Sequence, residues 1–166
     1  LVASILDRLP AGTRVHFVTH SLGGLIVREL FSDEFASRRW RDSIEPGRIC
    51  MIFPPNRGAE LADRWHERWW FRLAFGRCSD VLTSEQARVL PVPPWPTGVI
   101  AGGRGDGRGR TSRVSGDDDG TVGVEETRLE GAAHLVLDVG HTFGMNEPAV
   151  IIACRQFLRT GELRAP

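Results

Sequence analysis

The feature that most constrains the fold is a strand that runs into a helix with only a tight turn between them. The segment TRVHFVTH, residues 13–20, is rich in β-branched and aromatic residues, which is typical of a buried strand. From Ser21 onward, apolar residues recur at helical spacing and predict a helix that continues to about residue 35. This join predicts one βα unit, with Ser21 at the turn.

Further strands and helices are expected along the rest of the chain. Three more apolar runs predict strands: GRICMIFPP at 47–55, TGVIAGG at 97–103 and AAHLVLDV at 132–139. Helices are expected at 1–9, 59–75 and 147–158, and a loop rich in Gly and Asp at 104–120. This alternation favours an α/β fold with a mostly parallel sheet flanked by helices. Because each strand is apolar on both faces, helices should cover both sides of the sheet.

Composition sets the scale of the protein and argues against several partners. With 166 residues, of which 41% are hydrophobic, residues 1–166 can form one domain. A formal net charge of zero argues against nucleic acid as a partner. No apolar run approaches the ~20 residues that cross a bilayer, so no transmembrane segment is expected. Cys50, Cys78 and Cys154 have no CxxC spacing and suggest neither a zinc site nor a disulfide framework.

The turn after the first strand is the first candidate for chemistry. Thr19-His20-Ser21-Leu22-Gly23 is a variant of the G-x-S-x-G pattern, with Thr at the first position. A serine on such a turn is exposed at the carboxyl end of its strand, and the next backbone N–H, that of Leu22, can face a developing oxyanion. The alternative is that Ser21 only caps the helix, which serines commonly do.

A nucleophilic serine needs a base, and three histidines follow Ser21 in the sequence. His66 falls within the predicted helix 59–75 and is most simply a surface residue, while His134 lies inside a predicted strand and should be packed. His141 follows the last strand, at the edge where ligands bind in open α/β sheets. His141 is therefore the candidate base.

The base needs a carboxylate to orient it, and the loop after the third strand offers three. Asp117 and Asp118 are expected to be solvated turn residues, whereas Asp119 directly precedes a glycine where the chain turns into the next element. Asp138 is a rival, but three residues before His141 on one strand it would point away. The Asp cluster could instead hold a hard cation, although no spaced set of further oxygens accompanies it.

Five segments, in this order, resemble the α/β-hydrolase family of lipases, esterases and thioesterases. They are FVTHSLGGLIVR, FPPNRGAELAD, GVIAGG, DDDGTVGVEETRL and GHTFGMNEPAVIIACRQFLRTGEL. The likeness is strongest to bacterial lipase-like hydrolases with a PPN-x-G-x-E-x-AD segment. The resemblance implies Ser21 as nucleophile, Asp119 as the acid and His141 as the base of a catalytic triad. It also implies hydrolysis of a small-molecule or lipid ester or thioester, without a cofactor.

The resemblance also predicts what differs here. Family members have a longer N-terminal half, so this chain is expected to lack the loop that donates the second oxyanion N–H, leaving Leu22 alone. The strand at 14–20 should then be an open edge. Trp65, Trp69 and Trp70 make residues 57–95 a possible cap, although an aromatic stripe also fits plain packing. An acyltransferase using the same triad and a non-catalytic binding module are the alternative functions.

Overall fold

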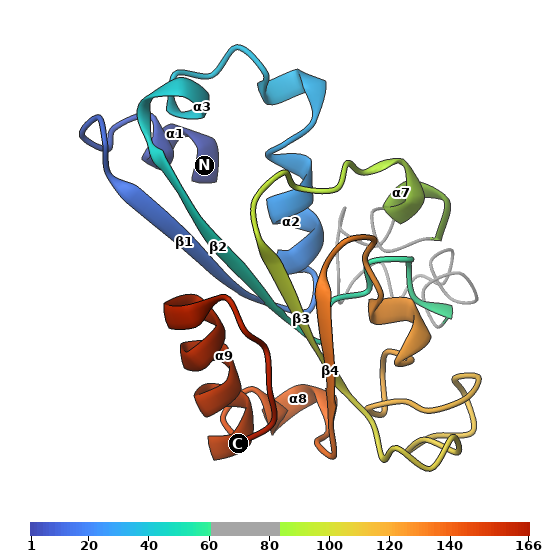
Figure 1. Ribbon diagram of the computed structural model, residues 1–166. Coiled ribbons are helices and arrows are strands. Elements are labelled where there is room, and N and C mark those ends of the chain that lie inside the picture. The colour runs from blue at the N-terminus through green and yellow to red at the C-terminus, as the bar shows by residue number, and fades with distance from the viewer. Residues whose placement is uncertain (61–83) are drawn as a thin grey trace.

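The computed structural model describes residues 1–60 and 84–166 (Figure 1). These residues form one four-stranded parallel sheet with strand order β1-β2-β3-β4. The strands are β1 Arg14–His20, β2 Glu45–Ile52, β3 Thr97–Gly102 and β4 Ala133–Leu137. The predicted α/β class and parallel sheet are confirmed, and each strand overlaps one of the predicted apolar runs. Most of the predicted helix 59–75 and cap 57–95, with the three tryptophans, His66 and Cys78, lies outside the described residues.

The helices differ more from the prediction than the strands do. They are α1 Val2–Leu6, α2 Gly23–Glu29, α3 Trp40–Ser43, α7 Ser84–Val89, α8 His141–Gly144 and α9 Pro148–Thr160, with 3-10 turns η1 Asp33–Phe35 and η2 Glu125–Thr127. The prediction that the second helix reaches residue 35 is wrong, because Ser32 is extended and its hydroxyl donates to the Glu29 carboxylate. The closing helix is confirmed, with Pro148 in its first turn. No helix among the described residues is long and apolar enough to cross a membrane.

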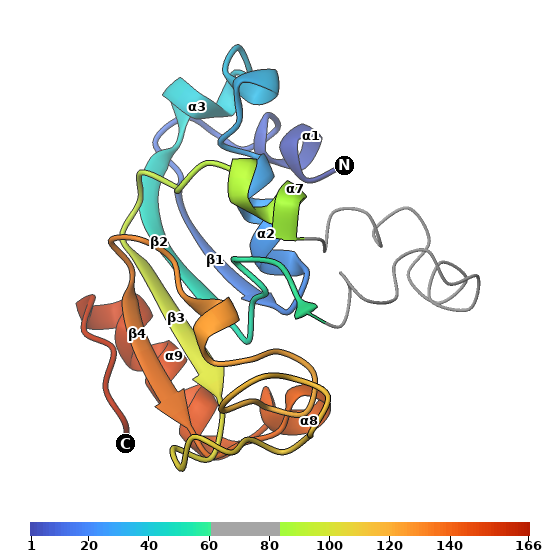
Figure 2. The same ribbon diagram turned by 90° about the vertical axis from the view of Figure 1, so that its right-hand side faces the viewer.

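The two central strands bury both of their faces. On β2, Ile49 and Met51 join a core with α1, α2 and α3, whereas Cys50 and Ile52 join a second core with α9. Figures 1 and 2 show α2 and α9 on opposite sides of the sheet. This alternation explains why β2 reads as a continuous apolar run in the sequence, as a strand covered on both faces requires. The carboxyl ends of the four strands meet at one edge.

The two outer strands contradict the prediction that every strand is covered on both faces. Along β1, exposed and half-buried residues alternate, and Val18 is 53% exposed. The reason is that α9 packs on β2 and β3, so that one face of β1 has no helix over it within the described residues. β4 is likewise only partly covered. The expectation that the strand at 14–20 is an edge is confirmed for the described sheet.

A buried arginine on α2 ties the end of β2 to the segment that enters β3. Arg28 is only 3% exposed, and its guanidinium donates to the carbonyls of Asn56, Leu90 and Pro91 at 2.6, 2.5 and 3.1 Å. Burial lowers the pKa of this guanidinium from its usual value. Arg28 thereby holds α2, which follows the Ser21 turn, against Asn56 after β2 and against residues 90–91 before β3.

Candidate active site

Ser21 lies on a strained turn at the carboxyl end of β1. Its φ of +52° is in the left-handed region, which residues other than glycine rarely adopt and which is concentrated at functional sites. The Ser21 N–H donates to the Ile52 carbonyl at 2.9 Å, so the neighbouring strand β2 holds the turn in place. Such a strand-to-helix turn lifts the hydroxyl above the sheet edge.

The glycines after Ser21 let the start of α2 approach two side chains closely. A Cβ on Gly24 would lie 2.8 Å from the Cβ of Pro54, and one on Gly23 would lie 3.2 Å from the Cβ of Thr19. These contacts identify what the two glycines make room for. The turn is therefore packed between its own strand and the Pro pair that ends β2.

The three residues singled out from the sequence lie in one hydrogen-bonded chain. His141 Nε2 is 3.0 Å from Ser21 Oγ, and His141 Nδ1 is 2.7 Å from Asp119 Oδ2. The Asp119 side chain is fully buried, and the His141 side chain is 11% exposed. With Nδ1 donating to the carboxylate, the neutral imidazole has a free lone pair on Nε2 that can accept the Ser21 hydroxyl proton.

The backbone fixes Asp119 and His141 relative to each other. Asp119 Oδ1 accepts the N–H groups of Thr121 and Val122 at 2.9 and 2.8 Å, which leaves Oδ2 for the imidazole. The Asp119 carbonyl in turn accepts the His141 N–H at 2.9 Å. The two residues are therefore joined both by their side chains and by their backbones, and neither can shift without the other.

The rival carboxylates serve the loop and do not contact His141. Asp117 accepts the N–H groups of Arg104 and Gly105, while Asp138 pairs with the Arg110 guanidinium at the surface. The expectation of solvated turn residues is wrong for Asp118, which is 0% exposed. Its carboxylate accepts three backbone N–H groups, those of Arg110, Thr111 and Gly120. Burial follows because the Gly-rich loop folds back over this side chain, which the local sequence does not reveal.

The described residues offer no alternative centre for metal chemistry around the Asp cluster. Within residues 1–60 and 84–166, no group of three or more His, Cys, Asp or Glu side chains is arranged to hold a metal ion.

His134 is half-buried on β4, and its Nε2 lies 2.8 Å from the Thr127 hydroxyl. Because that hydroxyl donates to the Val124 carbonyl, His134 Nε2 donates in turn and has a structural contact.

Leu22 places one backbone N–H beside the Ser21 hydroxyl, at the start of α2. This N–H makes no hydrogen bond to any other described residue. An N–H group at this position faces the site where charge develops when a serine attacks a carbonyl. That Leu22 alone donates to the oxyanion stays a prediction.

Two residues at the site were missed in the sequence analysis. His20 Nε2 is 3.1 Å from the His141 carbonyl oxygen, and the two imidazole centroids are 5.1 Å apart. The buried Phe53 ring lies 5.9 Å from both imidazoles, and Phe53 also has a positive φ of +52°. The signal was present for His20, since a residue next to a nucleophile at a strand end lies at the same sheet edge as the other catalytic groups.

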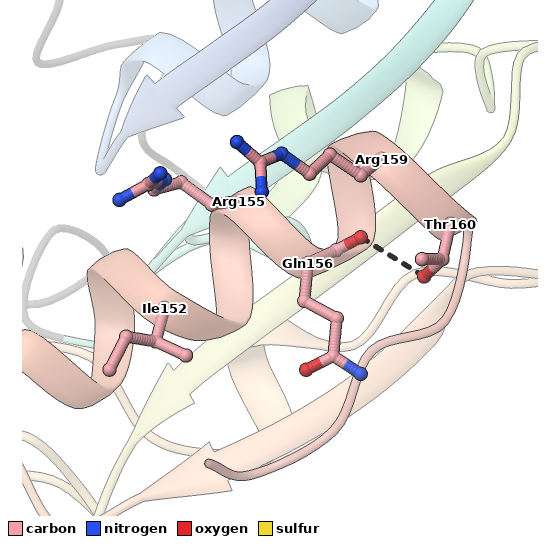
Figure 3. A pocket seen from close by; sticks show the side chains of 5 residues that line it. All are labelled: Ile152, Arg155, Gln156, Arg159 and Thr160. Atoms are coloured by element: carbon pink, nitrogen blue, oxygen red, sulfur yellow. Dashed lines mark hydrogen bonds between the residues drawn. The ribbon is translucent and has the colours of Figure 1, made fainter.

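The hollow on α9 is separate from this site. Figure 3 shows its lining, which comes from one face of α9: Ile152, Arg155, Gln156, Arg159 and Thr160. None of the residues hydrogen-bonded to Ser21, Asp119 or His141 is among them. The candidate site is thus the sheet edge at the ends of β1, β3 and β4, and not this hollow.

Two solved structures share this arrangement of the chain. The mature form of Bacillus licheniformis lipase BlEst2 aligns over 89% of this chain and 65% of its own, with 17% identity and a TM-score of 0.62. The propeptide form of that lipase aligns over 92% of this chain and 37% of its own, with 19% identity and a TM-score of 0.62. The chain has an α/β-hydrolase-like fold. It spans less than two thirds of the length of either lipase chain, and neither a family model nor a curated protein sequence matches it.

Stability is expected to fall as the pH drops from ~7.5 to ~5.5. Burial lowers the pKa of His20 and of His134 below the usual 6.5. Below about pH 6.5, the unfolded chain therefore binds protons more readily than the folded chain. The stability that the two neutral histidines contribute is complete above that pH and is lost as the pH falls through their lowered pKa values. Denaturant unfolding at both pH values measures the effect, and His134→Gln should weaken it. An equal or larger unfolding free energy at the lower pH contradicts the prediction.

Proposed function

We propose that this chain is a serine hydrolase that cleaves a carboxylic ester or thioester through an acyl-enzyme. The observation that carries the proposal is the hydrogen-bonded chain from Ser21 Oγ through His141 to the buried carboxylate of Asp119. Along the chain, the nucleophile comes first, the orienting carboxylate second and the base third, which is the order that the α/β-hydrolase fold uses. The positive φ of Ser21 is a second, independent support, because strain of this kind is maintained where it serves function.

In the first half of the reaction, Ser21 Oγ attacks the substrate carbonyl carbon while His141 Nε2 takes its proton. The carbonyl oxygen becomes an oxyanion, which the Leu22 N–H stabilises. The C–O or C–S bond then breaks, and His141 returns the proton to the leaving alcohol or thiol. Asp119 keeps the imidazole in the tautomer that accepts on Nε2 and stabilises the imidazolium that forms.

In the second half, His141 removes a proton from water, and the resulting nucleophile attacks the acyl-Ser21 carbonyl. The acid leaves, and Ser21 recovers its proton from the imidazolium. The same residues would transfer the acyl group to an alcohol in place of water. We favour hydrolysis and an ester substrate because the two solved structures compared above are of a lipase.

A fluorophosphonate probe tests the proposal directly, because it forms a bond to an activated serine while fluoride leaves. We expect mass spectrometry to locate the label on Ser21, and Ser21→Ala to abolish both labelling and hydrolysis of a short p-nitrophenyl ester. Labelling is the more sensitive readout, because it needs one reaction at the serine and no turnover.

Ser32 provides a matched control, because its hydroxyl donates a hydrogen bond to the Glu29 carboxylate and not to a histidine. Ser32→Ala should be labelled and should hydrolyse the ester like the unmodified chain. Labelling that persists in Ser21→Ala at another residue refutes the assignment of the nucleophile. If the unmodified chain neither reacts with the probe nor hydrolyses the ester, the proposed hydrolase activity is refuted and a non-catalytic binding module is favoured.

A further inference from the structure

His20 is placed to hold the backbone that carries the candidate base. Its Nε2 lies 3.1 Å from the carbonyl oxygen of His141. A carbonyl can only accept a hydrogen bond, so His20 Nε2 carries the proton and Nδ1 has the lone pair. The bond joins residue 20 on β1 to the first residue of α8, which are 121 positions apart in the sequence.

This contact adds to the hydrogen bonds by which Asp119 holds His141. The His141 N–H donates to the Asp119 carbonyl, the ring Nδ1 pairs with the Asp119 carboxylate, and the carbonyl accepts from His20. Asp119 therefore fixes one side of the residue and His20 the other. Without His20, the carbonyl end of His141 has no hydrogen bond from another described side chain.

The same contact links the residues proposed as base and nucleophile, because His20 and Ser21 are consecutive. Ser21 is held on its own side by the bond from its N–H to Ile52. His20 thus connects the strained turn to the loop that presents the imidazole, across the 3.0 Å gap between Ser21 Oγ and His141 Nε2. A displacement of ~1 Å between such groups is enough to cost about 10² in rate.

The surroundings of His20 keep its imidazole in place and neutral near pH 7. Its ring meets the buried Phe53 ring edge to face, with centroids 5.9 Å apart and an angle of 82° between the rings. Burial lowers the pKa of His20, and the neighbouring His141 lowers it further, while the bond to the His141 carbonyl and the Asp119 charge oppose this. A neutral His20 adds no positive charge beside the imidazolium that forms on His141 during the reaction.

We propose that His20 is a positioning residue that holds His141 in register with Ser21 through its Nε2–H bond to the His141 carbonyl. The inference rests on the proposed function, since register matters only if His141 serves Ser21. It assigns His20 no contact with the substrate. What His20 supplies is a hydrogen-bond donor of fixed length and direction, and a side chain with the same donor should replace it.

Two substitutions separate the donor from the ring. His20→Gln keeps an N–H near the position of Nε2, whereas His20→Phe keeps an aromatic ring against Phe53 but has no donor. We expect His20→Phe to lower kcat for the p-nitrophenyl ester ~10- to 100-fold with little change in KM, and to slow fluorophosphonate labelling equally. His20→Gln should stay within about threefold of the unmodified chain.

His16→Phe is the matched control on the same strand. His16 is exposed, and its Nδ1 accepts the Arg48 N–H, away from the site. The His16→Phe substitution should leave kcat and the rate of fluorophosphonate labelling unchanged. Equal losses in His16→Phe and His20→Phe, or in His20→Gln and His20→Phe, overturn the proposal, because they indicate a general effect of substitution in β1.

Imidazole nitrogen NMR gives a readout that needs no catalysis. In the unmodified chain near pH 7.5, His20 should be the Nε2–H tautomer, and His141 should have its proton on Nδ1. His141 should lose this single tautomer in His20→Phe and keep it in His20→Gln. A His20 protonated only on Nδ1 in the unmodified chain overturns the proposal. If the chain neither labels nor hydrolyses, the proposed function fails, while these spectra still show whether the His20 hydrogen bond orders the His141 imidazole.

Discussion

Asp119→Asn should lower turnover of a short ester by about 10⁴-fold and leave the fold intact, as loss of the orienting carboxylate does in serine proteases with a Ser-His-Asp triad. Asp119 Oδ2 accepts from His141 Nδ1 at 2.7 Å, and an amide can present its NH₂ group there instead. The imidazole would then carry its proton on Nε2, where it can no longer accept from Ser21. Steady-state kinetics and thermal unfolding of the variant measure both parts of the expectation.

The neighbouring carboxylates provide the comparison. Asp138 is exposed, and its partner among the described residues is Arg110, so Asp138→Asn should change neither turnover nor stability appreciably. Asp118→Asn should lower the stability instead, because both oxygens of its buried carboxylate accept backbone N–H groups. An amide has a single accepting oxygen, so its NH₂ group would face at least one of these N–H donors. If Asp118→Asn or Asp117→Asn abolishes turnover in a folded protein and Asp119→Asn is harmless, the carboxylate has been assigned wrongly.

The candidate site could be predicted from the sequence because its residues follow strands. A parallel sheet brings the carboxyl ends of its strands to one edge, so a residue after each strand needs only the strand prediction to be placed there. Ser21, Asp119 and His141 follow β1, β3 and β4, respectively. The spacing along the chain, 98 residues from Ser21 to Asp119, was irrelevant once the strands had been found.

What could not be predicted depends on contacts between distant segments. The short helices α3, α7 and α8 have four to six residues, too few to display a periodicity. Asp118 is buried by a loop whose N–H groups come from positions 110 and 111, so its environment is not encoded locally. β1 and β4 have the composition of covered strands, but coverage depends on where α9 packs.

Gly102→Ala should reduce turnover by ~10²-fold and lower the unfolding free energy by about 1–3 kcal/mol. Gly102 ends β3, and a Cβ there would lie 2.7 Å from the Asp119 Cβ and 2.7 Å from the Val139 carbonyl oxygen. One contact is the candidate acid itself, and the other lies in the connection between β4 and His141. An added methyl group therefore forces apart the two segments whose 2.7 Å hydrogen bond orients the imidazole.

Gly140→Ala is the matched control, because it adds the same methyl group next to His141 where there is room. A Cβ on Gly140 would lie 3.6 Å from its nearest neighbour, the Asp119 carbonyl oxygen, and its φ of −91° suits any residue. Alanine at this helix start should cost at most ~1 kcal/mol and leave turnover within a few fold.

Ester kinetics well below the unfolding temperature separate the effect on turnover from the effect on stability in each variant. If Gly102→Ala is as active as Gly140→Ala, the close approach of β3 to Asp119 does not control the register of acid and base. Repulsion at Gly102 should instead act on kcat far more than on KM, because it moves the groups that transfer the proton and leaves Ser21 and the Leu22 N–H in place.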